Sequence, residues 1–176
     1  KLVVMTTNDN AYHAALDWAD AGREVVAIVD TRANPDGEIV EQARSRGLKV
    51  ITGSAVIEAH GGKRVTGVSV ATINAAGDKV TGAVEKLDCD TVATSGGWSP
   101  AVHLSCHTGS RPQWSDEVIG FVPGPTQQKQ LVAGALQGSF GLKDCLEEGF
   151  QAGRDAATNA GFEAAAEIAV PQVEEL

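Results

Sequence analysis

The first half of the chain switches between strand-like apolar runs and helix-like apolar spacing. Continuous runs rich in β-branched residues predict three buried parallel strands, at residues 2–6, 24–30 and 48–51. Apolar residues at helical spacing predict helices from Ala11 to Ala21 and from Asp36 to Arg46. The pattern therefore predicts a right-handed β-α-β-α-β unit with a parallel sheet.

The spacing then changes to the two-residue alternation of half-buried strands. Such strands are expected at residues 55–60, 64–73 and 80–87, separated by turn-forming residues at 61–62 and 75–78. These three strands predict an antiparallel meander inserted after the parallel unit. A short apolar strand at 89–94 then returns to the parallel sheet.

The second half of the chain gives weaker signals. Proline and polar residues fill positions 108–117, and brief strands are expected at 118–122 and 131–134. Apolar residues from Leu142 to Ala157 share one face of a last helix, on which Cys145 is expected to be buried. We expect a nucleotide-binding-type subdomain at 1–94, a return segment of an incomplete domain at 95–160, and a fraying tail at 161–176.

Composition and charge exclude several classes of protein. The 176 residues are 43% hydrophobic and carry a net charge of -9, so the chain can form a core but lacks the basic face of a nucleic-acid-binding protein. The longest aliphatic run, Val25 to Val29, is far shorter than the roughly 20 residues of a membrane span. Three cysteines without a C-x-x-C motif are typical of a reducing cytoplasm, and Lys1 suggests that the natural chain starts further upstream.

The first strand-turn-helix lies where a dinucleotide-binding fingerprint would lie. Its three glycine positions are taken by Thr6, Asn8 and Ala11. The first two side chains would fill the space of a pyrophosphate, whereas the third can still pack the helix on the strand. Asp30 follows at the distance of a ribose-binding carboxylate. The loop is thus either an atypical nucleotide site or an ordinary strand-helix connection.

Two further turns could approach a ligand closely because they lack bulky side chains. Gly96 and Gly97 follow the strand at 89–94, and Gly134 and Gly138 precede the last helix. Glycines that simply make turns remain the alternative.

No convincing catalytic or metal-binding group stands out. His103, Cys106 and His107 form an H-x-x-C-H cluster, but no second pair at matching spacing completes a zinc site. Their role stays open. We therefore expect neither a metal site nor a catalytic residue in this chain.

At the level of longer motifs, the chain resembles the α subunits of heterotetrameric sarcosine oxidases. The resemblance rests on the V-A-T-S-G-G-W-S-P-A-V-H-L string and on three further segments, found at residues 92–104, 120–124, 132–142 and 6–12. It implies an α/β, Rossmann-like βαβαβ parallel sheet with an inserted β-meander, the second half of a two-dinucleotide-domain flavoprotein.

For the whole enzyme, the resemblance implies oxidative demethylation of sarcosine to glycine, with formation of hydrogen peroxide and with formaldehyde or methylenetetrahydrofolate. It implies NAD in the α subunit, FAD and FMN in the complex, and the other subunits as partners. The NAD fingerprint itself would precede Lys1. This chain alone is expected to be inactive and without cofactor, and it could self-associate.

The resemblance also assigns the cofactor-facing turns. These are Gly96 and Gly97 at the first crossover, and Gly134, Ala135 and Gly138 at the second, where Ala135 replaces an aspartate of flavoprotein relatives. Two other functions stay open. One is a pyridine-nucleotide reductase subdomain that binds NADH through Asp30, and the other is a purely structural interaction module.

Overall fold

A four-stranded parallel sheet organises the first part of the molecule. The computed structural model describes residues 1–163 and 169–173, which belong to two compact units that divide after Gly97. In the first unit, the strand order is β3-β2-β1-β7, formed by β1 (Leu2–Thr6), β2 (Val25–Asp30), β3 (Val50–Ile51) and β7 (Thr91–Ser95). All pairs are parallel, so the carboxyl ends of the strands meet at one edge.

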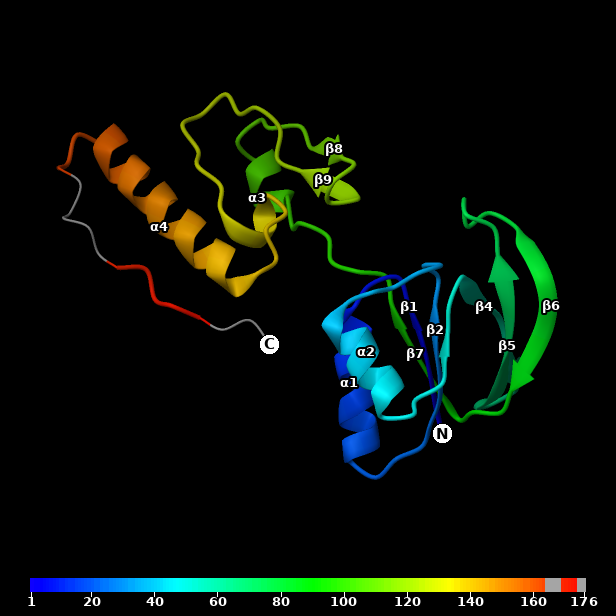
Figure 1. The fold of residues 1–176 in the computed structure, drawn as a ribbon. Coiled ribbons are helices and arrows are strands. Elements are labelled where there is room, and N and C mark those ends of the chain that lie inside the picture. Colours follow the sequence, from blue (N-terminus) through cyan, green and yellow to red (C-terminus); the bar gives the residue numbers. More distant parts are fainter. Residues whose placement is uncertain (164–168, 174–176) are drawn as a thin grey trace. The chain divides into compact units, whose positions relative to one another are not determined.

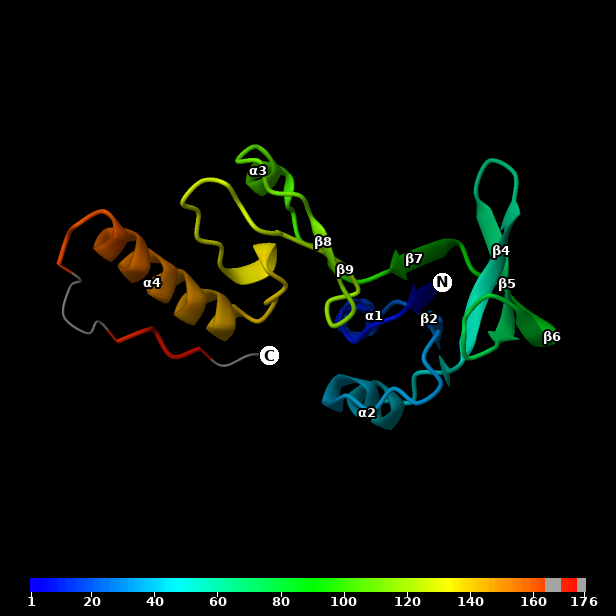
Figure 2. The ribbon, with the colours of Figure 1, turned by 90° about the horizontal axis from the view of Figure 1, so that it is seen from above.

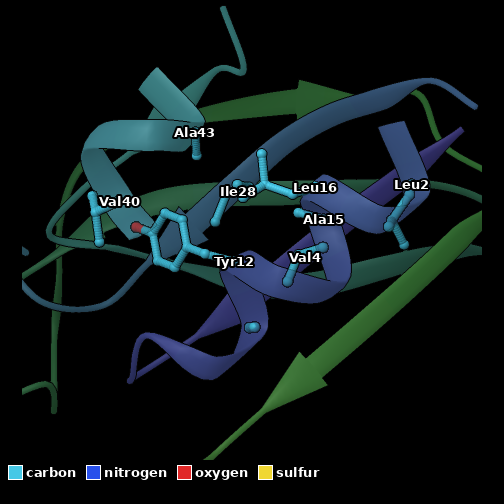
Figure 3. Packing of buried hydrophobic residues seen from close by; sticks show 9 residues of the cluster. Leu2, Val4, Tyr12, Ala15, Leu16, Ile28, Val40 and Ala43 are labelled. Atoms are coloured by element: carbon cyan, nitrogen blue, oxygen red, sulfur yellow. The ribbon is translucent and has the colours of Figure 1, made fainter. Parts of the chain in front are cut away.

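Two helices cover one face of this sheet. They are α1 (Asn10–Asp20) and α2 (Glu38–Ser45), and Figure 3 shows their side chains packed on those of β1 and β2. Tyr12 and Ile28 are completely buried at the centre of this cluster. The other members are small or aliphatic: Leu2, Val4, Ala11, Ala15, Leu16, Val40 and Ala43. Burial of these faces removes apolar area from water, which is the main force that fixes the helices on the sheet.

An antiparallel meander covers the opposite face. Its strands are β4 (Ser54–Gly61), β5 (Val65–Ile73) and β6 (Val80–Leu87), in the order β4-β5-β6 (Figures 1 and 2). Val68 and Val70 of β5 pack on Val3, Ala27 and Val29 of the parallel sheet. The first unit therefore has three layers, and the parallel sheet lies in the middle.

The second unit has little regular structure before its last helix. It contains α3 (His103–Cys106), β8 (Gln113–Ser115), β9 (Gly120–Val122), the 3₁₀ turn η1 (Gly134–Leu136) and α4 (Leu142–Asn159). Within the described part of this unit, no apolar side chain other than that of Pro100 is buried. Several large ones are more than half exposed, namely Trp98, Leu104, Trp114, Ile119, Phe121, Leu142 and Phe162.

The predicted fold class is confirmed, with a parallel unit, an inserted meander and a return strand. The prediction of a strand at 131–134 is wrong, because Gly134 has φ +64° and starts the 3₁₀ turn. The prediction that Cys145 is buried is also wrong, because its side chain is covered only partly, by Gly134 and Ser139 of the turn before α4.

Two elements of the second unit were not predicted, and one predicted segment lies partly outside the described residues. The strand β8 forms because Trp114 pairs with Phe121 across an antiparallel ladder, with ring centroids 5.3 Å apart. The short helix α3 follows Pro100. The expected tail lies partly outside the described residues. Among the helices that the structure describes, none is long and apolar enough to cross a membrane.

Candidate functional site

The ends of three parallel strands define the candidate site. The ladders pair Thr6 of β1 with Asp30 of β2 on one side and with Ser95 of β7 on the other. These three residues therefore lie side by side at the carboxyl edge of the sheet. In open α/β sheets, ligands bind in the crevice outside this edge.

The turn from β1 to α1 is filled by its own side chains. The Thr6 hydroxyl donates to the Asn8 carbonyl oxygen at 2.7 Å and accepts the Asn8 N–H at 3.1 Å. The Asn8 side chain accepts the Asn10 N–H at 3.0 Å and donates to the Ser95 hydroxyl at 3.2 Å. Ala11 is buried, as a residue that packs the helix on the strand should be. The side chains at the first two glycine positions of a fingerprint thus bind backbone groups of the turn itself.

The first predicted glycine turn lies beside this loop. Gly97 has φ +93°, a conformation that favours glycine, and a Cβ there would lie 3.7 Å from Asn8 Nδ2. Gly96 has open space around its Cα. The structure therefore brings Gly96 and Gly97 to the same edge as Thr6, Asn8 and Asp30.

Asp30 is completely buried, and both of its carboxylate oxygens are occupied. Oδ2 accepts the Tyr12 hydroxyl at 2.8 Å and Arg32 Nη2 at 2.8 Å. Oδ1 accepts the Arg32 backbone N–H at 2.9 Å and Arg32 Nε at 3.1 Å. A carboxylate offers about four acceptor positions, so this one has none left for a ribose hydroxyl.

The same contacts fix the protonation of the two donors. Burial, reinforced by the hydrogen bond to Asp30, raises the pKa of Tyr12 far above its usual range. The hydrogen bond to Asp30 also raises the pKa of Arg32. Tyr12 therefore stays a phenol and Arg32 a guanidinium, and neither can act as a base.

Arg32 has a second carboxylate partner. Its Nη2 donates to Asp9 Oδ1 at 2.6 Å, across two side chains that are 34% and 42% exposed. Asp9 stands at the N-cap of α1 but makes no side-chain capping hydrogen bond there. Its carboxylate instead lies against Gly37, where a Cβ atom would collide with it. Asp9 thus connects the first turn to the loop before α2.

An open cavity of about 380 Å³ lies on another side of the loop after β2. Its lining consists of Thr31, Ala33, Gly53, Ile73 and the 74–77 turn. These residues offer hydroxyl, amide and backbone groups, and none of them is ionisable. Acid-base chemistry is therefore not available from the lining of this cavity.

One Ser-His pair in the meander has the distances of a catalytic pair, but a substrate cannot reach its hydroxyl group. His60 Nε2 lies 2.7 Å from the Ser69 hydroxyl, and His60 Nδ1 lies 3.9 Å from Glu58 Oε1. Ser69 is only 2% exposed in the middle of β5. A substrate carbonyl cannot reach a hydroxyl at this depth, so the pair is structural.

The second predicted glycine turn belongs to the second unit and is held by a glutamate of α4. Gly134 and Gly138 have φ +64° and +105°, and Ala135 is exposed. Glu148 accepts the Gly134 N–H at 2.6 Å and the Ser139 hydroxyl at 2.5 Å. The hydrogen bond from Ser139, together with that from Gly134, lowers the pKa of Glu148.

The H-x-x-C-H cluster does not gather at a site. His103 and Cys106 lie on α3, and His107 follows it with an exposed side chain. In residues 1–163 and 169–173, no three histidine, cysteine or acidic side chains group as metal ligands would. The structure gives this cluster no role.

Sequence reasoning placed Asp30 at this edge but missed its partners. Arg32 lies two residues after Asp30, and side chains at this spacing in an extended chain share one face. Glu148 lies three residues after Cys145 and so near the apolar face of α4, where an acidic residue needs a partner. Both spacings were readable in the sequence, whereas the seating of Asp9 against Gly37 was not.

The fold of this chain also occurs in solved oxidoreductase structures. It resembles bacillithiol disulfide reductase from Staphylococcus aureus, with a TM-score of 0.57 and 14% identity over 80% of this chain and 43% of that one. It also resembles T. acidophilum thioredoxin reductase, with a TM-score of 0.51 and 16% identity over 78% of this chain and 47% of that one. At these identities the likeness shows the fold.

Sequence comparison identifies a narrower relationship. The chain is 36% identical over 170 residues to sarcosine oxidase subunit alpha from Corynebacterium sp. (strain P-1), which covers 96% of this chain and 17% of that protein. It is 33% identical over 146 residues to the same subunit from Rhizobium meliloti (strain 1021), over 83% of this chain and 14% of that protein. No family model matches. The chain is thus related to the sarcosine oxidase α subunit, as its motifs predicted, and spans about one sixth of the length of these relatives.

Proposed function

We propose that this chain is a non-catalytic part of an oxidoreductase subunit of the sarcosine oxidase type. In this proposal, its first unit keeps the fold of a nucleotide-binding domain but does not bind a nucleotide in its own strand-end crevice. The whole enzyme would oxidise sarcosine to glycine and form hydrogen peroxide, with release of formaldehyde or transfer of the one-carbon unit to folate. The relationship to sarcosine oxidase α subunits supports this activity for the larger protein.

The occupied carboxylate of Asp30 carries the proposal. A ribose hydroxyl would have to displace Tyr12 or Arg32 from a fully buried acid. Displacement would leave a buried charge with fewer donors, which costs about 1–3 kcal/mol for each lost bond. The residues at this edge therefore do not fit the adenosine half of NAD, and Thr6 and Asn8 do not fit its pyrophosphate.

The second turn fits a flavin no better. Ala135 has no side-chain acceptor for a ribityl or ribose hydroxyl, and the Gly134 N–H is already bound by Glu148. We therefore assign no cofactor to this chain alone. NAD, FAD and FMN remain proposals for the larger assembly, in which Gly96 and Gly97 could form part of the wall of an NAD site.

A role in assembly is supported by the second unit. Its described residues expose large apolar side chains and bury none beyond Pro100, so this unit cannot hold itself together by a hydrophobic core. We propose that residues 95–160 belong to a domain that other segments of the α subunit complete. In this proposal the domain also contacts the other subunits, and the enzyme works in the cytoplasm. A purely structural interaction module is the second candidate, favoured by the same exposed side chains.

Equilibrium dialysis against NAD and NADH tests the proposal on the full chain. We expect no saturable binding of either nucleotide at concentrations up to about 1 mM. A dissociation constant above this value is too weak for a specific nucleotide site. Micromolar binding of NADH that is lost in Asp30→Asn would establish the reductase alternative instead. Capture of another subunit of the enzyme with equal yield in the presence and absence of NAD would favour the structural module.

A further inference from the structure

Arg32 has two carboxylate partners. Asp30 fixes the position of its guanidinium, and Asp9 adds a second negative charge beside it. Asp30 binds its Nε and Nη2 groups from the buried side, which fixes the plane of the guanidinium. The same Nη2 atom donates to Asp9 on the solvent side. A guanidinium held in a fixed plane is a ready-made partner for a phosphate or a carboxylate.

Asp9 binds the solvent side of the Arg32 guanidinium and does not cap α1 with its side chain. An N-cap aspartate ordinarily accepts a backbone N–H of the first helical turn, but Asp9 makes no such bond. Its carboxylate instead lies between Arg32 and Gly37, and a methyl group at Gly37 would overlap with it. The contact therefore depends on a residue without a side chain in the facing loop.

We infer that Asp9 is an internal ligand of Arg32. Its carboxylate occupies the position in which this arginine would otherwise hold the phosphate of a nucleotide diphosphate. The inference rests on the proposed function, because it explains by charge why the crevice excludes nucleotides. With Asp9 and Asp30 around one guanidinium, the cluster carries a net charge of about -1 and repels a phosphate in addition to blocking it.

The test removes this charge and measures anion binding. Asp9→Asn keeps the shape of the side chain, removes one negative charge and leaves Asp30 as the one carboxylate bound to Arg32. Titration calorimetry of the full chain at low salt, with inorganic pyrophosphate and with ADP as probes, should show binding at least about tenfold tighter than to the parent. The gain should disappear when Arg32→Gln is added to Asp9→Asn.

A matched variant separates this effect from a general loss of negative charge. Asp20 pairs with Arg46 on the surface, and this arginine is 36% exposed against 34% for Arg32. Asp20→Asn therefore frees an equally accessible guanidinium that has no second carboxylate behind it. It should leave the affinity for both probes unchanged. Equal gains in Asp9→Asn and Asp20→Asn would overturn the inference.

The remaining outcomes distinguish the inference from the proposed function. If the parent chain binds ADP with micromolar affinity, the proposed function is wrong. If Asp9→Asn retains the parent's circular dichroism and melting profile but binds neither probe more tightly, Asp9 is not an internal ligand. Asp9→Ser tests the same point with a smaller side chain. If neither variant binds the probes more tightly than the parent, the inference is overturned.

Discussion

The Tyr12 hydroxyl donates a 2.8 Å hydrogen bond to Asp30 Oδ2, and both side chains are completely buried. The bond joins the first turn of α1 to the end of β2, so a polar contact lies within the apolar layer between helices and sheet. Figure 3 shows the ring of Tyr12 inserted among the aliphatic side chains of this layer. A buried carboxylate is stable there only because Tyr12 and Arg32 together satisfy it.

The ionisation of Tyr12 should be suppressed in the folded chain. Tyr12 is the only tyrosine, so the absorbance of tyrosinate near 295 nm reports this residue alone. Its raised pKa means that the folded state keeps a proton that the unfolded chain loses at about pH 10. The contribution of Tyr12 to the free energy of unfolding should therefore be constant below pH 10 and fall as the pH rises further.

In an alkaline titration, the tyrosinate signal should appear only together with loss of the near-ultraviolet circular dichroism. Reversible ionisation at about pH 10 in the folded chain would show that Tyr12 is not buried against Asp30. Tyr12→Phe, which removes the signal, identifies the contribution of the three tryptophans.

Loss of Arg32 should destabilise the first unit strongly. Arg32→Met keeps the length of the aliphatic side chain but leaves Asp30 with Tyr12 and one backbone N–H as donors. Removing one partner of a buried ion pair costs roughly 3 kcal/mol or more, which urea unfolding would measure. Arg46→Met breaks the exposed pair with Asp20 and should change the midpoint little, and an equal loss in both variants would contradict the account.

The two glycines after β7 should differ in their tolerance of alanine. Gly97 has φ +93°, so Gly97→Ala forces an L-residue into a strained conformation at a cost of about 1–2 kcal/mol. Gly96→Ala adds a methyl group to open space and should be nearly neutral. Thermal melts of the two variants measure the difference, and equal stabilities would mean that this turn is not held in the described conformation.

The glycine turn that contains Gly134 and Gly138 should lose its order in acid. The pKa of Glu148 is lowered by Ser139 and Gly134, so its bonds to the turn are fully formed above about pH 4.3 and are lost as the pH falls through the lower folded value. The amide resonance of Gly134, followed by NMR, should titrate with a midpoint below that of an ordinary glutamate. Glu148→Gln should abolish this titration, whereas Glu147→Gln should preserve it.

The sequence predicted the first unit well because its signals are local and mutually consistent. The runs before Thr6 and Asp30 mark buried strands, and the segment from Val65 to Ile73 marks another strand. The expectation that this last strand is half-buried is wrong, because residues 67–71 are buried on both faces between the parallel sheet and the neighbouring meander strands. The parallel order follows from the strand-helix-strand pattern, so the convergence of strand ends at one edge could be predicted as well.

The contacts of Asp30 with Tyr12 and of Asp9 with Gly37 could not be predicted in the same way. Whether Asp30 faces a ligand or Tyr12 depends on how α1 is seated on β2, which is a matter of packing between distant segments. The strand expected at 131–134 failed for a similar reason, since apolar residues alone do not form a strand where Gly134 takes a positive φ. In the second unit, apolar side chains gave helix and strand signals without the burial that ordinarily accompanies them.

Chemical-shift mapping by NMR tests the central claim most directly. NADH is added to the ¹⁵N-labelled full chain, and the amide resonances of residues 6–11 and of Arg32 are followed to millimolar concentration. These resonances should stay in place, because Thr6, Asn8 and Asp30 are occupied by partners within the chain. Saturable shifts confined to these amides would show a dinucleotide seated at this edge and would contradict the claim.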